Sequence, residues 1–488
     1  MASRTYRRSN RLIQAFGCPC DKALAQYANR RIDADLARRG FLIGMGASML
    51  AAVLPEFSRA QQPGAATAAA QSTTFTNFRL FDGKSDALQG GMYLVVEGGR
   101  ISQLRRGAPP VTEGQRVIDC GGKVMMPGLI DMHWHSLIAA LPIQVVLQGD
   151  MSFVYLAAGA EAQRTLLRGF TTIRDVGGPA FALRQAIDAG VLSGPRIYPC
   201  GAMITTTGGH GDFRLLADIP RTTGQLSAVE KTGGSAIADS ADEVRLRVRE
   251  QFMQGATQIK IVGNGGVSTP RSPLDMLTFT EPQLRAAVET ASDWGTYVAV
   301  HAYTPAAVQR AVAAGAQCIE HGHLMDERSA EALAKNGTWL STQPFVSEED
   351  VAPLQGPARE KFQAVVSGTD NMYRLARKHG LKVAFGTDLI FSPTLATRQG
   401  TMLGHMTRWY SAAETLRMAT GINGQLLALA GERNPYPGKL GVLEEGAYAD
   451  LLIVAGDPLQ DVTLLADPGQ NLQLIMKDGR IYKDTLKA

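Results

Sequence analysis

Two histidines separated by a single residue, His133 and His135, close an apolar run that begins at Leu129. In a β-strand, side chains two residues apart point to the same side, so both imidazoles could bind one cation. An isolated pair of this kind is weak evidence, because partly buried histidines near a loop give the same pattern. Their chemistry has to be judged with the other ligand-type residues of the chain.

Three further ligand-type residues close apolar runs in the same way. His301 follows the run 296–300, His321 follows 316–320, and Asp388 follows 383–387. The whole chain has only eight histidines, so four of them at strand ends, together with an aspartate, form an unlikely coincidence. A metal site explains the pattern better than separate packing roles do.

Lys260 lies inside the short apolar run 258–262, where burial of a charged ammonium is costly. One explanation is a buried carboxylate that pairs with the lysine. The other is carboxylation of the amine, which gives an anion with two oxygens that can bridge two cations. The five residues at strand ends favour the second explanation.

The elements that must position these residues are short β-type runs that alternate with helical stretches. Such alternation predicts repeated βα units and a parallel sheet. Eight runs over about 270 residues predict a TIM barrel, in which active sites lie at the carboxyl ends of the strands. A doubly wound open sheet is the alternative. The runs end near His135, Val176, Met203, Val262, His301, His321, Gln343 and Asp388, and the helical candidates are 241–254, 281–294, 305–314 and 363–378.

Short β-type runs with Asp-Gly and Gly-Gly turns flank the barrel on both sides. They cover 75–81, 92–96, 101–104 and 116–120 before it, and 450–454 and 472–476 after it. We expect the two segments to pair into one small β-sandwich. The predicted domains are therefore 73–126 and 437–488 for the sandwich and 127–436 for the metal-binding barrel.

The first 60 residues resemble a twin-arginine export signal. Arg38 and Arg39 precede the apolar run 41–54, which is too short to span a bilayer comfortably, and Ser58-Arg59-Ala60 offers a cleavage site. An N-terminal membrane anchor and a chance arginine pair are the alternatives. Residues 61–72, rich in Gln, Ala and Gly, are expected to form a flexible linker. The signal predicts a periplasmic or secreted enzyme that uses the Tat machinery as a precursor.

The net charge argues against a nucleic-acid partner once the signal is considered separately. Residues 1–60 carry ten Lys or Arg and four Asp or Glu, which is +6 of a total of +4, so the remainder carries −2. No basic stripe with interleaved aromatic residues occurs elsewhere. The basic character of the whole chain therefore gives no support for a nucleic-acid partner, and we expect none.

The ordered set of motifs resembles the amidohydrolase superfamily, over roughly residues 73–485. The chain looks closest to its imidazolonepropionase-like and Xaa-Pro dipeptidase-like (prolidase-like) members, which include ochratoxin-hydrolysing amidohydrolases. The motifs are His133-x-His135, Lys260 in a β run, His301, His321 in Ile-Glu-His-Gly, Asp388 in Gly-Thr-Asp, and the flanking segments 126–131 and 446–451.

The resemblance assigns a role to each ligand-type residue. It implies that His133, His135 and Asp388 bind one metal, that His301 and His321 bind a second, and that carboxylated Lys260 bridges the two. Zinc is the expected ion, and Asp388 is the expected proton shuttle. His210, in the glycine-rich segment 207–212, is expected to contact the substrate and assist catalysis. Tyr303 is expected to bind a substrate carboxylate.

These assignments predict a binuclear hydrolase that cleaves the amide bond of a dipeptide or an N-acyl amino acid. Hydrolysis of a cyclic amide, a lactone or a phosphotriester at the same site is the alternative within this architecture. A non-catalytic binding protein on a barrel scaffold would be expected to lack some of the ligands, and no gap is visible. The resemblance also implies a homo-oligomer.

Overall fold

The computed structural model describes residues 72–110, 114–220 and 226–486. The predicted export signal, and the predicted linker up to residue 71, lie outside the described residues. Within the described part of the chain, no helix is both long enough and apolar enough to cross a bilayer. The described residues belong to one compact unit.

Eight parallel strands form the barrel, as predicted, and together with the β domain described below this confirms the predicted fold class. Most of their residues are buried, which is typical of parallel strands that are covered on both faces. The strands are β6 (Leu129–Trp134), β7 (Phe170–Asp175), β8 (Arg196–Pro199), β11 (Ile259–Val262), β12 (Val298–Ala302), β13 (Cys318–His321), β14 (Trp339–Thr342) and β15 (Val383–Phe385). Two short strands, β9 (Met203–Thr205) and β10 (Ser235–Ile237), extend the sheet beside β11.

Two sets of hydrogen bonds join the strands into a ring. Strands β6 to β8 form one sheet and β11 to β15 belong to another. The backbone N–H of Asp388, just after β15, donates to the carbonyl of His133 on β6 at 2.8 Å. On the other side, Gln258 Nε2 donates to the carbonyls of Tyr198 and Asp175 at 3.0 and 3.2 Å.

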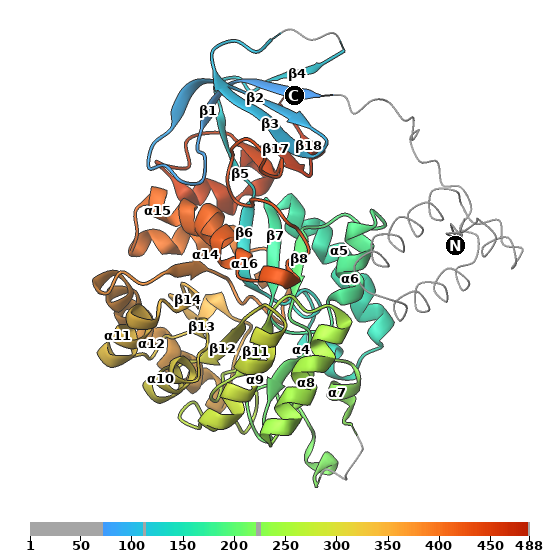
Figure 1. The fold of residues 1–488 in the computed structure, drawn as a ribbon, viewed down its shortest axis with the longest axis vertical. Coiled ribbons are helices and arrows are strands. Elements are labelled where there is room, and N and C mark those ends of the chain that lie inside the picture. The colour runs from blue at the N-terminus through green and yellow to red at the C-terminus, as the bar shows by residue number, and fades with distance from the viewer. Residues whose placement is uncertain (1–71, 111–113, 221–225, 487–488) are drawn as a thin grey trace, which may run out of the picture. The chain divides into compact units, whose positions relative to one another are not determined.

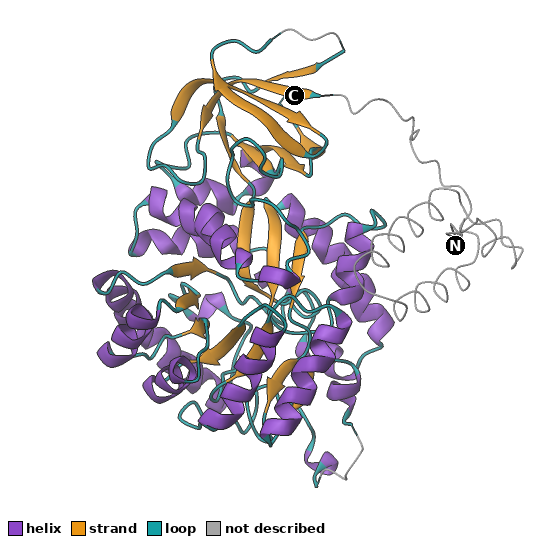
Figure 2. Ribbon diagram, in the orientation of Figure 1, coloured by secondary structure: helices purple, strands orange, loops and turns teal. Residues whose placement is uncertain are grey.

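Helices surround these strands (Figure 2). Their ends follow local sequence signals: Ser240 and Glu243 form a capping box at the start of α8, and Gly255 ends it with φ of 100°. Helix α12 begins earlier than predicted, with Pro357 in its first turn. The helices are α4 (Ile143–Gln148), α5 (Met151–Leu167), α6 (Phe181–Asp188), α7 (Ala228–Lys231), α8 (Ala241–Gln254), α9 (Glu281–Asp293), α10 (Pro305–Ala313), α11 (Glu327–Asn336), α12 (Gly356–Lys378), α13 (Pro393–Ala396), α14 (Gln399–His405), α15 (Ala412–Arg417), α16 (Asn423–Ala428) and α17 (Pro468–Asn471).

The segments before and after the barrel pair with each other, as expected, in one eight-stranded sheet (Figure 1). Strand β16 runs antiparallel to β5, with Leu451 opposite Pro127. The sheet has its own core, which includes Phe75, Leu94 and Met476. Its strands are β1 (Thr73–Leu80), β2 (Gln89–Glu97), β3 (Arg100–Arg106), β4 (Arg116–Asp119), β5 (Val124–Pro127), β16 (Leu451–Val454), β17 (Leu472–Lys477) and β18 (Arg480–Asp484).

Candidate active site

One cavity of about 100 Å³ collects every side chain that the sequence singled out for chemistry. Its ionisable lining comes from five barrel strands, β6, β11, β12, β13 and β15, and from the loop after β9. The predicted residues in it are His133, His135, His210, Lys260, His301, Tyr303, His321 and Asp388. The positions are those that the TIM barrel uses for active sites.

His133, His135 and Asp388 converge on one point of the cavity. Asp388 Oδ1 lies 3.4 Å from Nε2 of His133 and 3.3 Å from Nε2 of His135. Ligand atoms of His133, His321 and Asp388 all lie within 4.8 Å of one another. Two imidazoles and a carboxylate at this spacing match the ligand chemistry of a divalent transition metal.

Each histidine of the first pair is anchored through Nδ1. In His133 this nitrogen lies 2.8 Å from Glu320 Oε2, and in His135 it lies 3.0 Å from the carbonyl oxygen of Gly177. A proton on Nδ1 satisfies both acceptors and leaves the Nε2 lone pair directed toward Asp388. Metal-binding histidines typically have their second nitrogen fixed in this way.

The second pair of histidines is fixed by the same principle. His321 Nδ1 lies 2.8 Å from Gln343 Oε1, and His301 Nε2 lies 3.1 Å from the carbonyl oxygen of Gly265. The other nitrogen of each ring has no hydrogen-bond partner among the described residues. The two rings are neighbours, with centroids 4.5 Å apart. The donor set therefore offers four oriented imidazoles for metal binding.

Burial keeps most of these imidazoles neutral, which is the form that binds metal. It lowers the pKa of His133, His301 and His321 well below the usual value, and the nearby Lys260 lowers each of them further. His135 differs: burial again disfavours its charged form, but the carboxylates of Asp388 and Asp175 and the carbonyl of Gly177 together outweigh burial and raise the pKa. In the absence of a cation, Asp388 thus acts as the partner of His135.

Lys260 lies on β11 with only 2% of its surface exposed. Its ammonium makes no ion pair or hydrogen bond with any described residue, so no carboxylate forms the direct partner considered from the sequence. Burial lowers the pKa of Lys260, although the more distant charges of Glu320 and Asp388 raise it in part. A buried lysine without a direct counter-charge is a candidate for chemical conversion to an anion.

His210 and Tyr303 lie against the second pair of histidines. The His210 and His301 ring centroids are 4.7 Å apart, and Tyr303 stacks on His321 at 4.7 Å. Burial lowers the pKa of His210 to about 3, so its ring is neutral. The hydroxyl of Tyr303 has no hydrogen-bond partner among the described residues, and both side chains are placed to meet a bound molecule.

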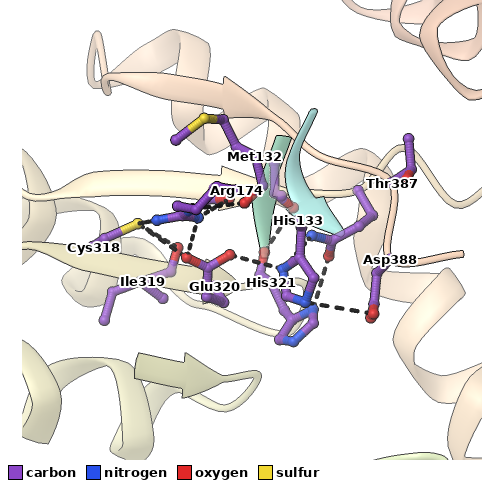
Figure 3. A network of polar contacts seen from close by, with 12 residues as sticks. Met132, His133, Arg174, Cys318, Ile319, Glu320, His321, Thr387 and Asp388 are labelled. Atoms are coloured by element: carbon purple, nitrogen blue, oxygen red, sulfur yellow. Dashed lines mark hydrogen bonds and ion pairs between the residues drawn. The ribbon is translucent and has the colours of Figure 1, made fainter. Parts of the chain in front are cut away.

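A buried ion pair behind His133 was not predicted. Arg174 on β7 and Glu320 on β13 are both fully buried, and Glu320 joins Arg174 to His133 (Figure 3). Arg174 also donates to the carbonyl of Met132 at 2.7 Å and to Ser341 Oγ at 2.9 Å. The sequence did carry a signal, because Arg174 and Glu320 are charged residues within predicted strands, as Lys260 is.

Asp131 was also missed, and it joins the two strands that meet at the cation site. Its carboxylate accepts from the backbone of His133 and Thr387 at 3.0 and 3.1 Å, and from Thr387 Oγ1 at 2.6 Å. Gln399 Nε2 adds a fourth bond at 2.9 Å. These bonds hold the turn in which Asp388 adopts a left-handed φ of 52°, a strained backbone typical of functional sites.

Apart from Ser268, the rest of the cavity wall is apolar. Apart from Lys260, no lysine or arginine of the described chain lines it. The apolar side chains come from the loops after β6, β9, β11, β14 and β15 and from α12: Ile138, Met203, Phe213, Val262, Val267, Phe345, Val351, Ala352, Leu354, Phe362, Ile390 and Phe391.

Comparison with known proteins gives matches across the barrel and much of the β domain. The model of the amidohydrolase family matches residues 124–482. The ochratoxinase of Aspergillus niger is 29% identical over 383 residues, which cover 74% of this chain and 76% of that enzyme.

Two crystal structures agree with this match. An amidohydrolase has a TM-score of 0.79 and 33% identity, with 85% of this chain and 99% of the other covered. A prolidase complexed with N-methylphosphonate-L-proline has a TM-score of 0.77 and 31% identity, with 85% and 100% covered.

Proposed function

The chain belongs to the amidohydrolase family and is a hydrolase of amide bonds, and on this premise we propose that it uses two divalent metal ions to cleave a dipeptide or an N-acyl amino acid. One observation carries the proposal: four imidazoles, each fixed through one nitrogen, surround Lys260 and Asp388 in a single cavity. The family model and the similar proteins confirm the family resemblance inferred from the sequence.

The ligand assignment follows the anchored nitrogens. His133 and His135 would hold one ion through Nε2 together with Asp388, and His321 through Nε2 and His301 through Nδ1 would hold the other. We expect zinc, since imidazole and carboxylate ligands suit it. When bound, such a pair of cations lowers the pKa of a water molecule toward neutrality and polarises the scissile carbonyl.

Lys260 would bridge the two ions as a carbamate. The neutral amine adds to carbon dioxide, so that a nitrogen–carbon bond forms and one proton is released. Burial lowers the pKa of Lys260 and so increases the neutral fraction that can react. The product is an anion in a place where an unpaired ammonium is costly.

Asp388 would move the proton during hydrolysis. Its carboxylate lies beside Nε2 of His133 and His135 at the cavity wall and is partly exposed. From this position it can take a proton from the attacking water and deliver it to the departing amine nitrogen, as a general base and then a general acid. The left-handed turn at Asp388 fixes the direction of the carboxylate.

The apolar walls of the cavity favour binding of a largely apolar substrate with few polar groups. An apolar lining with a few convergent polar residues is typical of small-molecule sites. We assign the Tyr303 hydroxyl to a substrate carboxylate and the neutral His210 ring to the amide or its neighbours. The similarity to an ochratoxinase and to a prolidase complexed with N-methylphosphonate-L-proline supports this substrate class.

A substrate screen with metal analysis tests the proposal. Purified protein should hold two ions per chain and should hydrolyse Xaa-Pro dipeptides or N-acyl amino acids, with ochratoxin A included in the panel. Asp388→Asn serves as the matched inactive variant. Activity confined to cyclic amides, lactones or phosphotriesters would overturn the substrate class. Fewer than one ion per chain, with stability unchanged by a chelator, would overturn the metal centre.

A further inference from the structure

The loop between β11 and α9, residues 263–280, is tied to helix α12 by one side chain. Lys361 Nζ donates to the carbonyl oxygens of Gly266 at 2.6 Å, Thr269 at 3.0 Å and Ser272 at 3.2 Å. An ammonium has three N–H donors, and here each has a backbone acceptor. The three acceptors span seven consecutive residues, so one group holds the whole turn of the loop.

The same loop determines where His210 lies. Thr269 Oγ1 accepts from the backbone N–H of Gly211 at 2.9 Å and lies 2.8 Å from His210 Nδ1. The hydroxyl can donate its own proton to Nδ1 while its oxygen accepts from Gly211, and this arrangement places the imidazole proton on Nε2. Thr269 is 1% exposed, so water does not compete for these bonds.

Packing fixes the ring from the other side. A Cβ atom at Gly266 would lie 2.4 Å from Cγ and Nδ1 of the His210 ring, so the loop backbone is in direct contact with the imidazole. Gly266 is also one of the carbonyls that Lys361 binds. A shift of this backbone must therefore displace the His210 ring or lengthen the hydrogen bond between His210 and Thr269.

We propose that Lys361 is a positioning residue for catalysis: by binding the carbonyls of Gly266, Thr269 and Ser272, it fixes the orientation of the His210 imidazole toward the substrate. The inference rests on the substrate-contacting role of His210 proposed above. The next residue, Phe362, lines the cavity, and so do Val267 and Ser268 of the loop. The contact of α12 with the loop thus joins two walls of the same cavity.

Two variants and a control separate this role from a general contribution to stability. Lys361→Met keeps the aliphatic stem and removes all three donors, whereas Lys361→Arg keeps a charged donor. Lys378→Met removes an exposed lysine from the same helix, where it pairs with Glu327 at 2.5 Å. All three are compared in the metal-loaded, full-length protein.

We expect Lys361→Met to increase deuterium uptake in peptides covering 263–277 and to lower kcat/KM by about 10- to 100-fold, the scale on which a misplaced catalytic group reduces rate. Metal content should not change. Lys361→Arg should recover much of the activity, and Lys378→Met should match the parent protein in both measurements. Unchanged uptake over 263–277 in Lys361→Met overturns the proposal, whatever the activity shows.

A double-mutant cycle tests the route through His210. If Lys361 acts through that ring, Lys361→Met will have little further effect on kcat/KM in a His210→Gln background, and Thr269→Val will reproduce most of the loss alone. Losses that multiply independently overturn the proposal. A parent protein that hydrolyses no amide would refute the proposed substrate class, and the exchange measurement would still decide whether Lys361 holds the loop.

Discussion

Replacement of Glu320 by glutamine tests the ion pair that supports the first cation site. Glu320 and Arg174 both have fully buried side chains, and Glu320 is the only carboxylate that pairs with Arg174 in the described chain. Glutamine keeps the shape and removes the charge, so Arg174 becomes a buried cation without a counter-ion. Removal of one partner of a buried pair typically costs about 3–5 kcal/mol.

The same change alters the protonation of His133. The Glu320 carboxylate accepts a hydrogen bond from His133 Nδ1 at 2.8 Å, whereas a glutamine amide directed there would donate a hydrogen bond to that nitrogen. The imidazole proton would then move to Nε2, the nitrogen that is placed to bind the cation. We expect metal affinity to fall by about 10- to 100-fold, the usual effect of losing such a supporting group.

Two assays measure the two effects separately. Urea unfolding of metal-free protein gives the stability change, and competition with a chelator gives the affinity change. Glu327→Gln, which removes an exposed carboxylate paired with Lys378, should leave both values unaltered. The explanation is refuted if Glu320→Gln keeps the metal-free stability of the parent to within about 1 kcal/mol. A partial return of stability in an Arg174→Met, Glu320→Gln double variant would support it.

Three further predictions concern the residues of the cavity. Lys260→Ala should reduce bound metal from two ions per chain to about one, measured by mass spectrometry, because the bridging anion is lost; full metal content would refute the carbamate. Asp388→Asn should lower kcat by about 10²–10⁴ with a smaller change in KM, as expected for a lost proton carrier. His210, with a folded pKa of about 3, is neutral in the fold but protonated in the unfolded chain below about pH 6.5. The contribution of neutral His210 to the stability of the metal-free protein is therefore present above that pH and is lost as pH falls toward 3. The free energy of unfolding of His210→Gln should decline less steeply between about pH 6 and 4 than that of the parent protein.

The sequence predicted the barrel and the residues that line its cavity because both depend on position within strands. His301 and His321 end successive strands, and parallel strands bring their carboxyl ends to one edge. The apolar run around Lys260 predicted a buried lysine, and Lys260 is buried. The same reasoning applied to Arg174 and Glu320 would have identified them as buried, although not as partners.

What the sequence could not predict depends on contacts between distant segments. Arg174 and Glu320 are 146 residues apart, and their pairing follows from the register of β7 and β13 around the barrel. Lys361 is 95 residues from Gly266, and its three bonds depend on the exact path of a loop. Loop conformation is determined by tertiary packing, for which local composition carries little information.

The bond between Asp388 and His133 also has a consequence for the order in which the enzyme can mature. His133 and His135 leave the ribosome first, because they precede Asp388 by more than 250 residues in the sequence. A nascent or truncated chain that stops before Asp388 has imidazoles but no carboxylate to complete the set. Tight uptake of metal should therefore mark the moment at which the last strand docks on the first, and would serve as a direct assay of completed folding.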